Sequence, residues 1–191
     1  MSLYKNKYRI ESARRPGWDY RNPGSYFITI CTSKRKHFFG ECKDGKMVLS
    51  AAGAMVQGFW FEIPKHFKHV RLGEFVVMPN HVHGILILGE CDFDVETVHC
   101  TVSTSKSSPT EKSQFFKDIG PKAGSVSVII RSYKSVCTKF IRKSFPDMNF
   151  AWQERFHDHI IRNEKSFNRI SEYIVNNPTN WKEDKFFRDL G

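Results

Sequence analysis

The sequence predicts an α+β fold in which helices pack on one face of an antiparallel sheet. Apolar residues alternate along 24–32 and again along 73–88, which indicates strands, whereas 50–61 and 125–143 have helical periodicity. The order of strand, helix, two strands and helix, with short connections, is typical of a ferredoxin-like (RRM-like) sheet. A chain of 191 residues is long enough for one well-formed core, so we expect a single domain over 1–191.

The first two elements have clear boundaries in the sequence. The strand over 24–32 has apolar residues on both faces, as expected for a buried strand. Ser50 is suited to cap the helix that follows, because its hydroxyl can accept a bond from a free amide of the first turn. We expect this helix to run to about Phe61 and to end at Pro64.

The stretch 73–88 predicts two buried strands joined at Met78-Pro79-Asn80, and the second strand opens with His81 and His83. Side chains alternate between faces along a strand, so both imidazoles point to one side and Val82 points to the core. Two neutral imidazoles on one face form half of a divalent-metal site. The alternative is two polar residues at the start of a strand, and the spacing alone is compatible with both.

The clearest helix in the sequence is predicted over 125–143. Its apolar residues form one stripe at 100° per residue, with Tyr133 at the centre of that stripe and basic residues on the back and flanks. A tyrosine in this position is either a core residue or a functional phenol close to the sheet. A further helix is predicted from the cap at Asn163 to about Val175, after a partly extended segment.

Two segments lie outside this pattern of strands and helices. Residues 1–23 form a basic N-terminal arm, in which Arg14 and Arg15 lie close to Trp18. Arginines beside aromatic rings suit phosphate contact and base stacking, and the alternative is an arm packed on the domain by its aromatic side chains. Residues 91–120 contain a Ser/Thr-rich stretch without periodicity, which we interpret as a flexible insertion.

The charge of the chain favours a polyanionic partner. Lys and Arg number 30 against 20 acidic residues, a net charge of +10. Residues 1–40 carry nine basic and two acidic residues, and residues 121–170 carry ten and four, so nucleic acid is favoured over an acidic membrane. The five cysteines lack a C-x-x-C pair, and we see no secretory signal and no membrane-spanning run. We therefore expect reduced thiols in a cytoplasmic, nucleoid-associated protein without a membrane partner.

Four blocks of the sequence carry a family resemblance. They are Met78-Pro79-Asn80-His81-Val82-His83, Ser132-Tyr133-Lys134-Ser135, the segment from Trp152 to Arg162, and Tyr173-Ile174 with Asn176-Asn177-Pro178. Together, and in this order, they resemble the REP-associated tyrosine transposases, which are HUH single-strand DNA nucleases related to small insertion-sequence transposases. The resemblance covers about residues 20–183.

The resemblance implies a mechanism and assigns roles to residues. His81 and His83 would hold Mg²⁺ or Mn²⁺, and Tyr133 would be the nucleophile that forms a 5′-phosphotyrosine and releases a 3′-OH. The substrate implied is single-stranded or hairpin DNA, nicked and rejoined without ATP. We expect the helix of Tyr133 to pack on the sheet face that presents the two histidines, so that the phenol reaches the metal.

One position departs from the family pattern. Relatives usually have a third metal ligand, an amide side chain one helical turn after the tyrosine, and Cys137 occupies that position here. A thiolate is poorly matched to Mg²⁺. His157 and His159, with Asp158 between them, are candidates for a ligand or base, or else hydrogen-bonded structural residues. Asn80 is expected to be a turn residue.

Five basic residues are predicted to contact DNA phosphates: Arg14, Arg15, Arg131, Lys134 and Arg155. A basic helix surface without a DNA role has the same composition, so this assignment depends on the resemblance. Two other functions remain compatible with the sequence, a hairpin-binding protein that has lost catalysis and, with less support, an RNA-binding module. Insertion-sequence relatives are dimers and REP-associated ones are monomers, so either a monomer or a homodimer is expected.

Overall fold

The computed structural model describes residue 15 and the ranges 17–90 and 122–187. Arg14, most of the basic arm and the 91–120 insertion therefore lie outside the described residues. A four-stranded antiparallel sheet forms the centre, in the order β4-β5-β1-β6. Its strands are β1 (Gly24–Cys31), β4 (Val70–Met78), β5 (His81–Leu88) and β6 (His157–Ile161).

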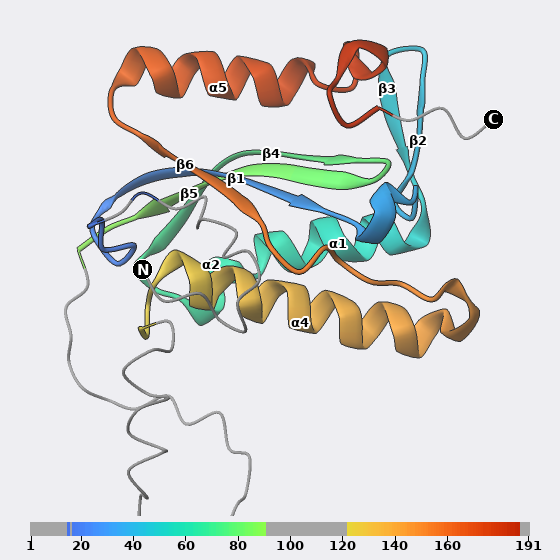
Figure 1. The fold of residues 1–191 in the computed structure, drawn as a ribbon, viewed down its shortest axis with the longest axis horizontal. Coiled ribbons are helices and arrows are strands. Elements are labelled where there is room, and N and C mark those ends of the chain that lie inside the picture. The colour runs from blue at the N-terminus through green and yellow to red at the C-terminus, as the bar shows by residue number, and fades with distance from the viewer. Residues whose placement is uncertain (1–14, 16, 91–121, 188–191) are drawn as a thin grey trace, which may run out of the picture.

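Two helices pack against one face of the sheet, which confirms the predicted fold class (Figure 1). They are α1 (Ala51–Phe61) and α4 (Val126–Ser144). Ser50 caps α1 as expected, because its hydroxyl accepts a hydrogen bond from the amide of Gly53 at 3.1 Å. Pro64 does not end the helical structure outright but stands in the first turn of a short helix, α2 (Ile63–His66), where its missing N–H costs nothing.

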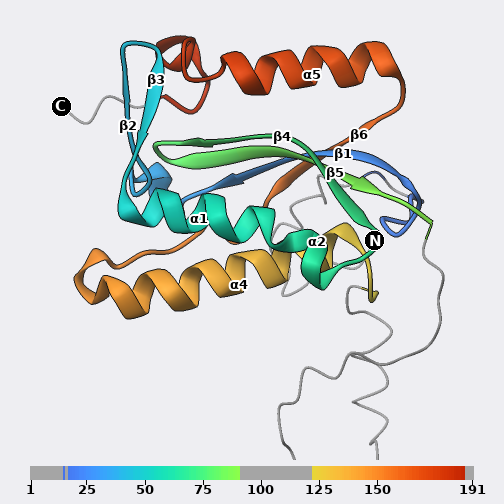
Figure 2. The same ribbon diagram turned by 180° about the vertical axis from the view of Figure 1, so that it is seen from behind.

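A third helix lies across the opposite face of the sheet. Figure 2 shows α5 (Glu164–Asn176) on one side of the strands, and α1 and α4 on the other. Asn163 caps α5, since its side-chain oxygen accepts from the amide of Ser166 at 2.8 Å. Along β5, Val82 and Leu86 face the core beneath α1 and α4, whereas Ile85 belongs to the cluster beneath α5. The side chains of this strand therefore alternate between two covered faces.

A small hairpin and three 3₁₀ turns complete the described structure. The hairpin pairs β2 (Gly40–Lys43) with β3 (Lys46–Leu49), and positive φ angles of 50° and 72° at Asp44 and Gly45 allow its tight turn. The turns are η2 (Ser33–Arg35), η3 (Pro146–Met148) and η4 (Trp181–Glu183). Within the described ranges, no helix is both long and apolar enough to span a bilayer.

Candidate functional site

Two buried histidines face each other on the α5 side of the sheet. β5 places His81 and His83 on one face, with their Nε2 atoms 3.0 Å apart and their side chains 0% and 1% exposed. Their register partners on β1 are Cys31 and Thr29. The sequence pattern is thus realised as a pair of imidazoles with converging nitrogens.

The turn before β5 sets the tautomer of His81. The side-chain amide of Asn80 donates to the carbonyl of Phe186 at 2.9 Å, which leaves its oxygen 2.8 Å from Nδ1 of His81. Since an amide oxygen only accepts, this network assigns the proton of His81 to Nδ1. Nε2 of His81 then carries a free lone pair, as a metal ligand requires. Asn80 is a turn residue as expected, and it also orients the histidine.

His83 has a polar partner on each ring nitrogen. Its Nδ1 lies 2.8 Å from the hydroxyl of Thr29, and its Nε2 lies close to His81 and 3.3 Å from the hydroxyl of Tyr173. A hydroxyl both donates and accepts, so Thr29 supports either tautomer of His83. When the proton is on Nδ1 and bonded to Thr29, Nε2 is free to bind a metal beside its neighbour.

Burial keeps both imidazoles neutral. Loss of hydration lowers the pKa of His81 to about 3, and the nearby positive charges of Arg35 and Lys185 act in the same direction. Burial also lowers the pKa of His83 well below its usual value, and His81 adds to this effect. Neutral imidazoles are the form that binds metal, so the pair is available as ligands at physiological pH.

The other half of the site comes from α5 and the segment after it. The hydroxyl of Tyr173 donates to Oδ2 of Asp184 at 3.0 Å, and the side-chain amide of Asn177 donates to the same oxygen at 2.9 Å. Tyr173 is 40% exposed, so its phenol is open to a substrate. Burial, followed by the charge of Asp184, raises the pKa of this phenol above its usual value.

The residues around the histidine pair could hold a divalent metal ion. Ligand atoms of His81, His83 and Asp184 lie within 4.8 Å of one another, the only such group among the described residues. The side-chain oxygen of Asn177 is buried and has no hydrogen-bond partner. A buried orphan oxygen is costly unless something binds it. Imidazole nitrogens with carboxylate and amide oxygens are groups that can hold a divalent metal ion.

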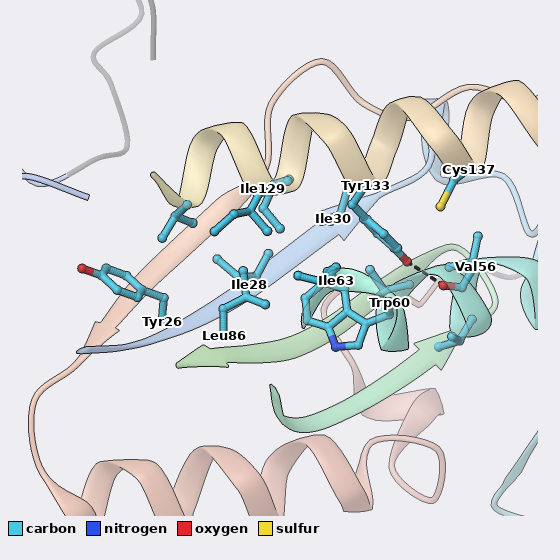
Figure 3. Packing of buried hydrophobic residues seen from close by; sticks show 14 of the residues in the cluster. Tyr26, Ile28, Ile30, Val56, Trp60, Ile63, Leu86, Ile129, Tyr133 and Cys137 are labelled. Atoms are coloured by element: carbon cyan, nitrogen blue, oxygen red, sulfur yellow. Dashed lines mark hydrogen bonds between the residues drawn. The ribbon is translucent and has the colours of Figure 1, made fainter. Parts of the chain in front are cut away.

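The expectation that Tyr133 reaches the histidines is wrong. Tyr133 is 2% exposed in the core between α4 and α1, where its hydroxyl donates to the carbonyl of Val56 at 3.0 Å (Figure 3). Helix α4 covers the face of β5 that carries Val82, so the sheet separates this phenol from the imidazoles. Burial raises the pKa of Tyr133 well above its usual value, with Cys137 acting in the same direction.

The sequence contains a second tyrosine, Tyr173, that has an amide side chain four residues later. An amide one helical turn after a tyrosine is expected of the family, and Tyr173 and Asn177 have this spacing on α5. At the same spacing after Tyr133 stands Cys137, which has no amide side chain. Cys137 is a fully buried residue of α4 in the core on the opposite side of the sheet, so it lies outside the candidate metal site. Burial raises the pKa of its thiol to about 12.

Of the remaining predicted site residues that the structure describes, only His157 and His159 share the sheet face of the histidine pair. Arg131 and Lys134 lie on α4, on the opposite side of the sheet, and Arg155 is exposed before β6. The guanidinium of Arg15 lies 5.8 Å from the centre of the Trp18 ring. His157 and His159 are exposed on β6, and His157 is the register partner of Thr29, so it shares the sheet face of His83. Asp158 points to the other face and is buried.

Comparisons with known proteins find a relative by sequence, and several solved structures are similar, among them two transposases. An uncharacterized protein of Haemophilus influenzae is 34% identical over 183 residues, covering 93% of each chain. A REP-associated tyrosine transposase bound to a REP hairpin has 20% identity and a TM-score of 0.48, covering 97% of this chain and 77% of that one. A putative transposase from Deinococcus radiodurans has 14% identity and a TM-score of 0.42, covering 85% and 97%. No family model matches the sequence.

Proposed function

We propose that this chain, which belongs to the same family as the uncharacterized Haemophilus influenzae protein, is a metal-dependent DNA nicking and joining enzyme of the transposase type. One observation carries this proposal. An accessible phenol, Tyr173, lies 3.3 Å from Nε2 of His83, with Asn177 one helical turn later. A nucleophile beside a pair of ligand imidazoles is the arrangement needed for transesterification of a phosphodiester.

In the proposed reaction the phenol oxygen of Tyr173 attacks the scissile phosphorus of a DNA strand. A bond forms between this oxygen and phosphorus, the P–O3′ bond breaks, and the leaving 3′ oxygen takes up a proton. The product is a 5′-phosphotyrosine with a free 3′-OH. Attack by a 3′-OH on the phosphotyrosine reverses these bond changes, so strands are rejoined without ATP.

The residues around the phenol have separate roles in this scheme. Asp184 already accepts the hydrogen bond of the Tyr173 hydroxyl, so it is placed to receive the proton that the attacking oxygen must lose. His81 and His83, with the free oxygen of Asn177, would hold Mg²⁺ or Mn²⁺, and Asp184 would serve as the base and not as a ligand. The bound ion would offset negative charge that builds up on the phosphate oxygens.

The proposed substrate is single-stranded or hairpin DNA. The net charge of +10 favours a polyanion, and the family resemblance of the four sequence blocks favours DNA over RNA. One chain supplies both the histidine pair and Tyr173. A monomer is therefore sufficient for the reaction, and we propose a nucleoid-associated role in the cytoplasm for it.

The proposal is tested by covalent trapping. The full chain is incubated with Mn²⁺ and a labelled DNA hairpin that has a single-stranded flank, and the protein–DNA adduct is resolved by denaturing electrophoresis. We expect an adduct with the wild type and with Tyr133→Phe, and none with Tyr173→Phe or His83→Ala. An adduct that survives Tyr173→Phe and is lost with Tyr133→Phe would overturn the assignment. Hairpin binding without an adduct in any metal would support a binding protein instead.

A further inference from the structure

The outer surface of α4 carries a groove that the proposed chemistry does not use. It has a volume of about 560 Å³ between this helix and the segment 151–154, which leads towards β6. Its charged and aromatic lining consists of Arg131, Lys134, Lys139, Arg142, Trp152 and Glu154. The groove lies on the side of the sheet opposite to α5, and thus opposite to the histidine pair.

The charge of this groove is strongly positive. Four cations and one acid line it, and the cations recur on α4 every three to five residues along one side of the helix. From Arg131 to Arg142 the helix rises by about 16 Å, at about 1.5 Å per residue. One strand of DNA has a phosphate about every 3.4 Å of duplex axis, so the row is long enough for several consecutive phosphates.

Two of the four cations hold the wall of the groove in place. The ammonium of Lys134 donates to the carbonyls of Gln153 and Glu154 at 2.7 and 3.0 Å. Nε of Arg142 donates to the carbonyl of Phe150 at 2.9 Å. These bonds fix the wall against α4. They also use some of the N–H donors of both side chains, which leaves fewer for a ligand.

The other two cations remain available to a ligand. Arg131 and Lys139 are exposed, and neither forms an ion pair within the described residues. The ammonium of Lys139 lies 5.9 Å from the ring centre of Phe140, at the surface. Exposed, unpaired cations in a row are what a phosphate backbone binds through counterion release.

The segment that forms the wall of the groove is hydrogen-bonded to β1, at the residue that pairs with the candidate metal ligand His81. The amide of Gln153 donates to the carbonyl of Cys31 at 2.8 Å, and Cys31 is the register partner of His81. Neighbouring strands lie about 4.8 Å apart, so the backbone at Gln153 lies roughly 10 Å from that of His81. A strand that leaves the groove over this edge would therefore pass next to the β1 residue that pairs with His81.

We infer that this groove binds the phosphodiester backbone of the DNA strand that enters or leaves the catalytic site. The inference rests on the proposed function, because the nearby histidine site is what connects the groove to a DNA strand. Arg131 and Lys139 contact the phosphates, and Lys134 and Arg142 hold the wall that shapes the groove.

The outer surface of α5 offers a matched control. A hollow there is lined by Lys165 and Arg169 together with Glu164 and Glu172, so its two cations are balanced by two acids. Lys165 and Arg169 are exposed, like the two groove cations. Replacement of either pair lowers the net charge by the same two units, but only one pair belongs to the positive groove.

The test measures binding of fluorescent single-stranded oligothymidylate by anisotropy at several salt concentrations. All proteins carry Tyr173→Phe, so that no cleavage interferes. We expect Arg131→Gln/Lys139→Gln to weaken binding and to reduce the slope of log K against log salt by about 1.4, or 0.7 for each lost phosphate contact. Lys165→Gln/Arg169→Gln should keep the slope of the parent, and Glu154→Gln should tighten binding.

Equal effects of the two double variants, or no effect of the groove variant, would overturn the inference. Displacement of oligothymidylate by a polyglutamate peptide of equal charge would also overturn the inference, because the groove would then be a general site for acidic peptides. Failure of the proposed chemistry would appear in a different experiment, in which the protein with Tyr173 intact forms no covalent adduct with DNA. Loss of binding in the groove variant would still be observed in that case.

Discussion

Nε2 of His83 lies 3.3 Å from the phenol oxygen of Tyr173, although 90 residues separate them in the sequence. The contact joins β5 to α5, the helix on the face of the sheet that α1 and α4 leave open. Asp184 bridges Tyr173 and Asn177 from the segment after that helix. Every group in the proposed chemistry is therefore supplied by one chain and by one face of its sheet.

Thr29→Val is predicted to weaken Mn²⁺ binding without disturbing the fold. The hydroxyl of Thr29 lies 2.8 Å from Nδ1 of His83 and is placed to hold the tautomer that leaves Nε2 free. Loss of such an orienting partner costs roughly ten- to a hundredfold in metal affinity. Isothermal titration with Mn²⁺ measures this, with Thr138→Val as the control, because the hydroxyl of Thr138 bonds to the carbonyl of Lys134 within α4, on the opposite side of the sheet. Unchanged affinity in Thr29→Val would argue against a metal on His83.

Tyr133→Phe is predicted to lower stability and to leave the covalent adduct intact. The substitution removes a buried hydrogen bond to the carbonyl of Val56, which contributes about 1 kcal/mol. Tyr133→Ala removes the whole ring from the core beside Trp60 and should cost about 3–5 kcal/mol. Urea unfolding gives both values. A phenylalanine variant of full stability that no longer forms the adduct would restore Tyr133 as the nucleophile.

The metal-free protein is predicted to lose stability as pH falls from about 7 to 5. Burial lowers the pKa of His81 to about 3 in the folded chain, whereas an unfolded histidine titrates near 6.5. Below about pH 6.5 the unfolded chain therefore binds a proton that the folded chain does not, and the free energy of unfolding falls. Urea midpoints in EDTA measure this effect. His81→Asn should show a shallower decline, and an equally steep one would contradict the assignment.

Gly84→Ala is predicted to disrupt the packing beneath the histidine strand. A Cβ at this position would lie 2.4 Å from Cζ2 of Trp60 and 2.9 Å from a ring carbon of Phe75. Those rings stack with their centres 4.5 Å apart, so there is little room for either to move. We expect a loss of about 1–3 kcal/mol, measured by urea unfolding with tryptophan fluorescence.

Gly58→Ala is the control for that variant. Gly58 is inside α1, and an added Cβ there would meet nothing within 4 Å. Alanine in a helix interior is more stable than glycine by about 0.5–1 kcal/mol. The two glycine variants should thus shift the urea midpoint in opposite directions, and a shift in the same direction would refute the packing argument.

The local elements were predictable because each has its own periodicity. The strand over 24–32, the strand pair over 73–88 and the helix over 125–143 correspond to β1, to β4 and β5, and to α4. Alternation along β5 also placed both imidazoles on one face, as the structure shows. The position of Tyr133 on the apolar stripe of α4 was predicted as well, and with it the possibility of a core residue.

The face of the sheet that α4 covers was not predictable from these patterns. Periodicity shows which side of a helix is buried but not against which surface, and β5 is buried on both faces. The strand therefore gives no signal of which helix covers the imidazoles. The ring contact of Phe186 with His81 joins residues that are equally far apart in the sequence, and no local pattern predicts it.

Alternation and helical spacing are properties of neighbouring residues, so the strands, the helices and the common face of His81 and His83 could be predicted from the chain. Which tyrosine lies beside the two histidines depends on the folded structure. Packing placed Tyr173 and Asn177 on the histidine face and sealed Tyr133 behind the sheet. The physical reason is that this choice depends on which apolar surfaces meet, and such contacts join residues far apart in the chain.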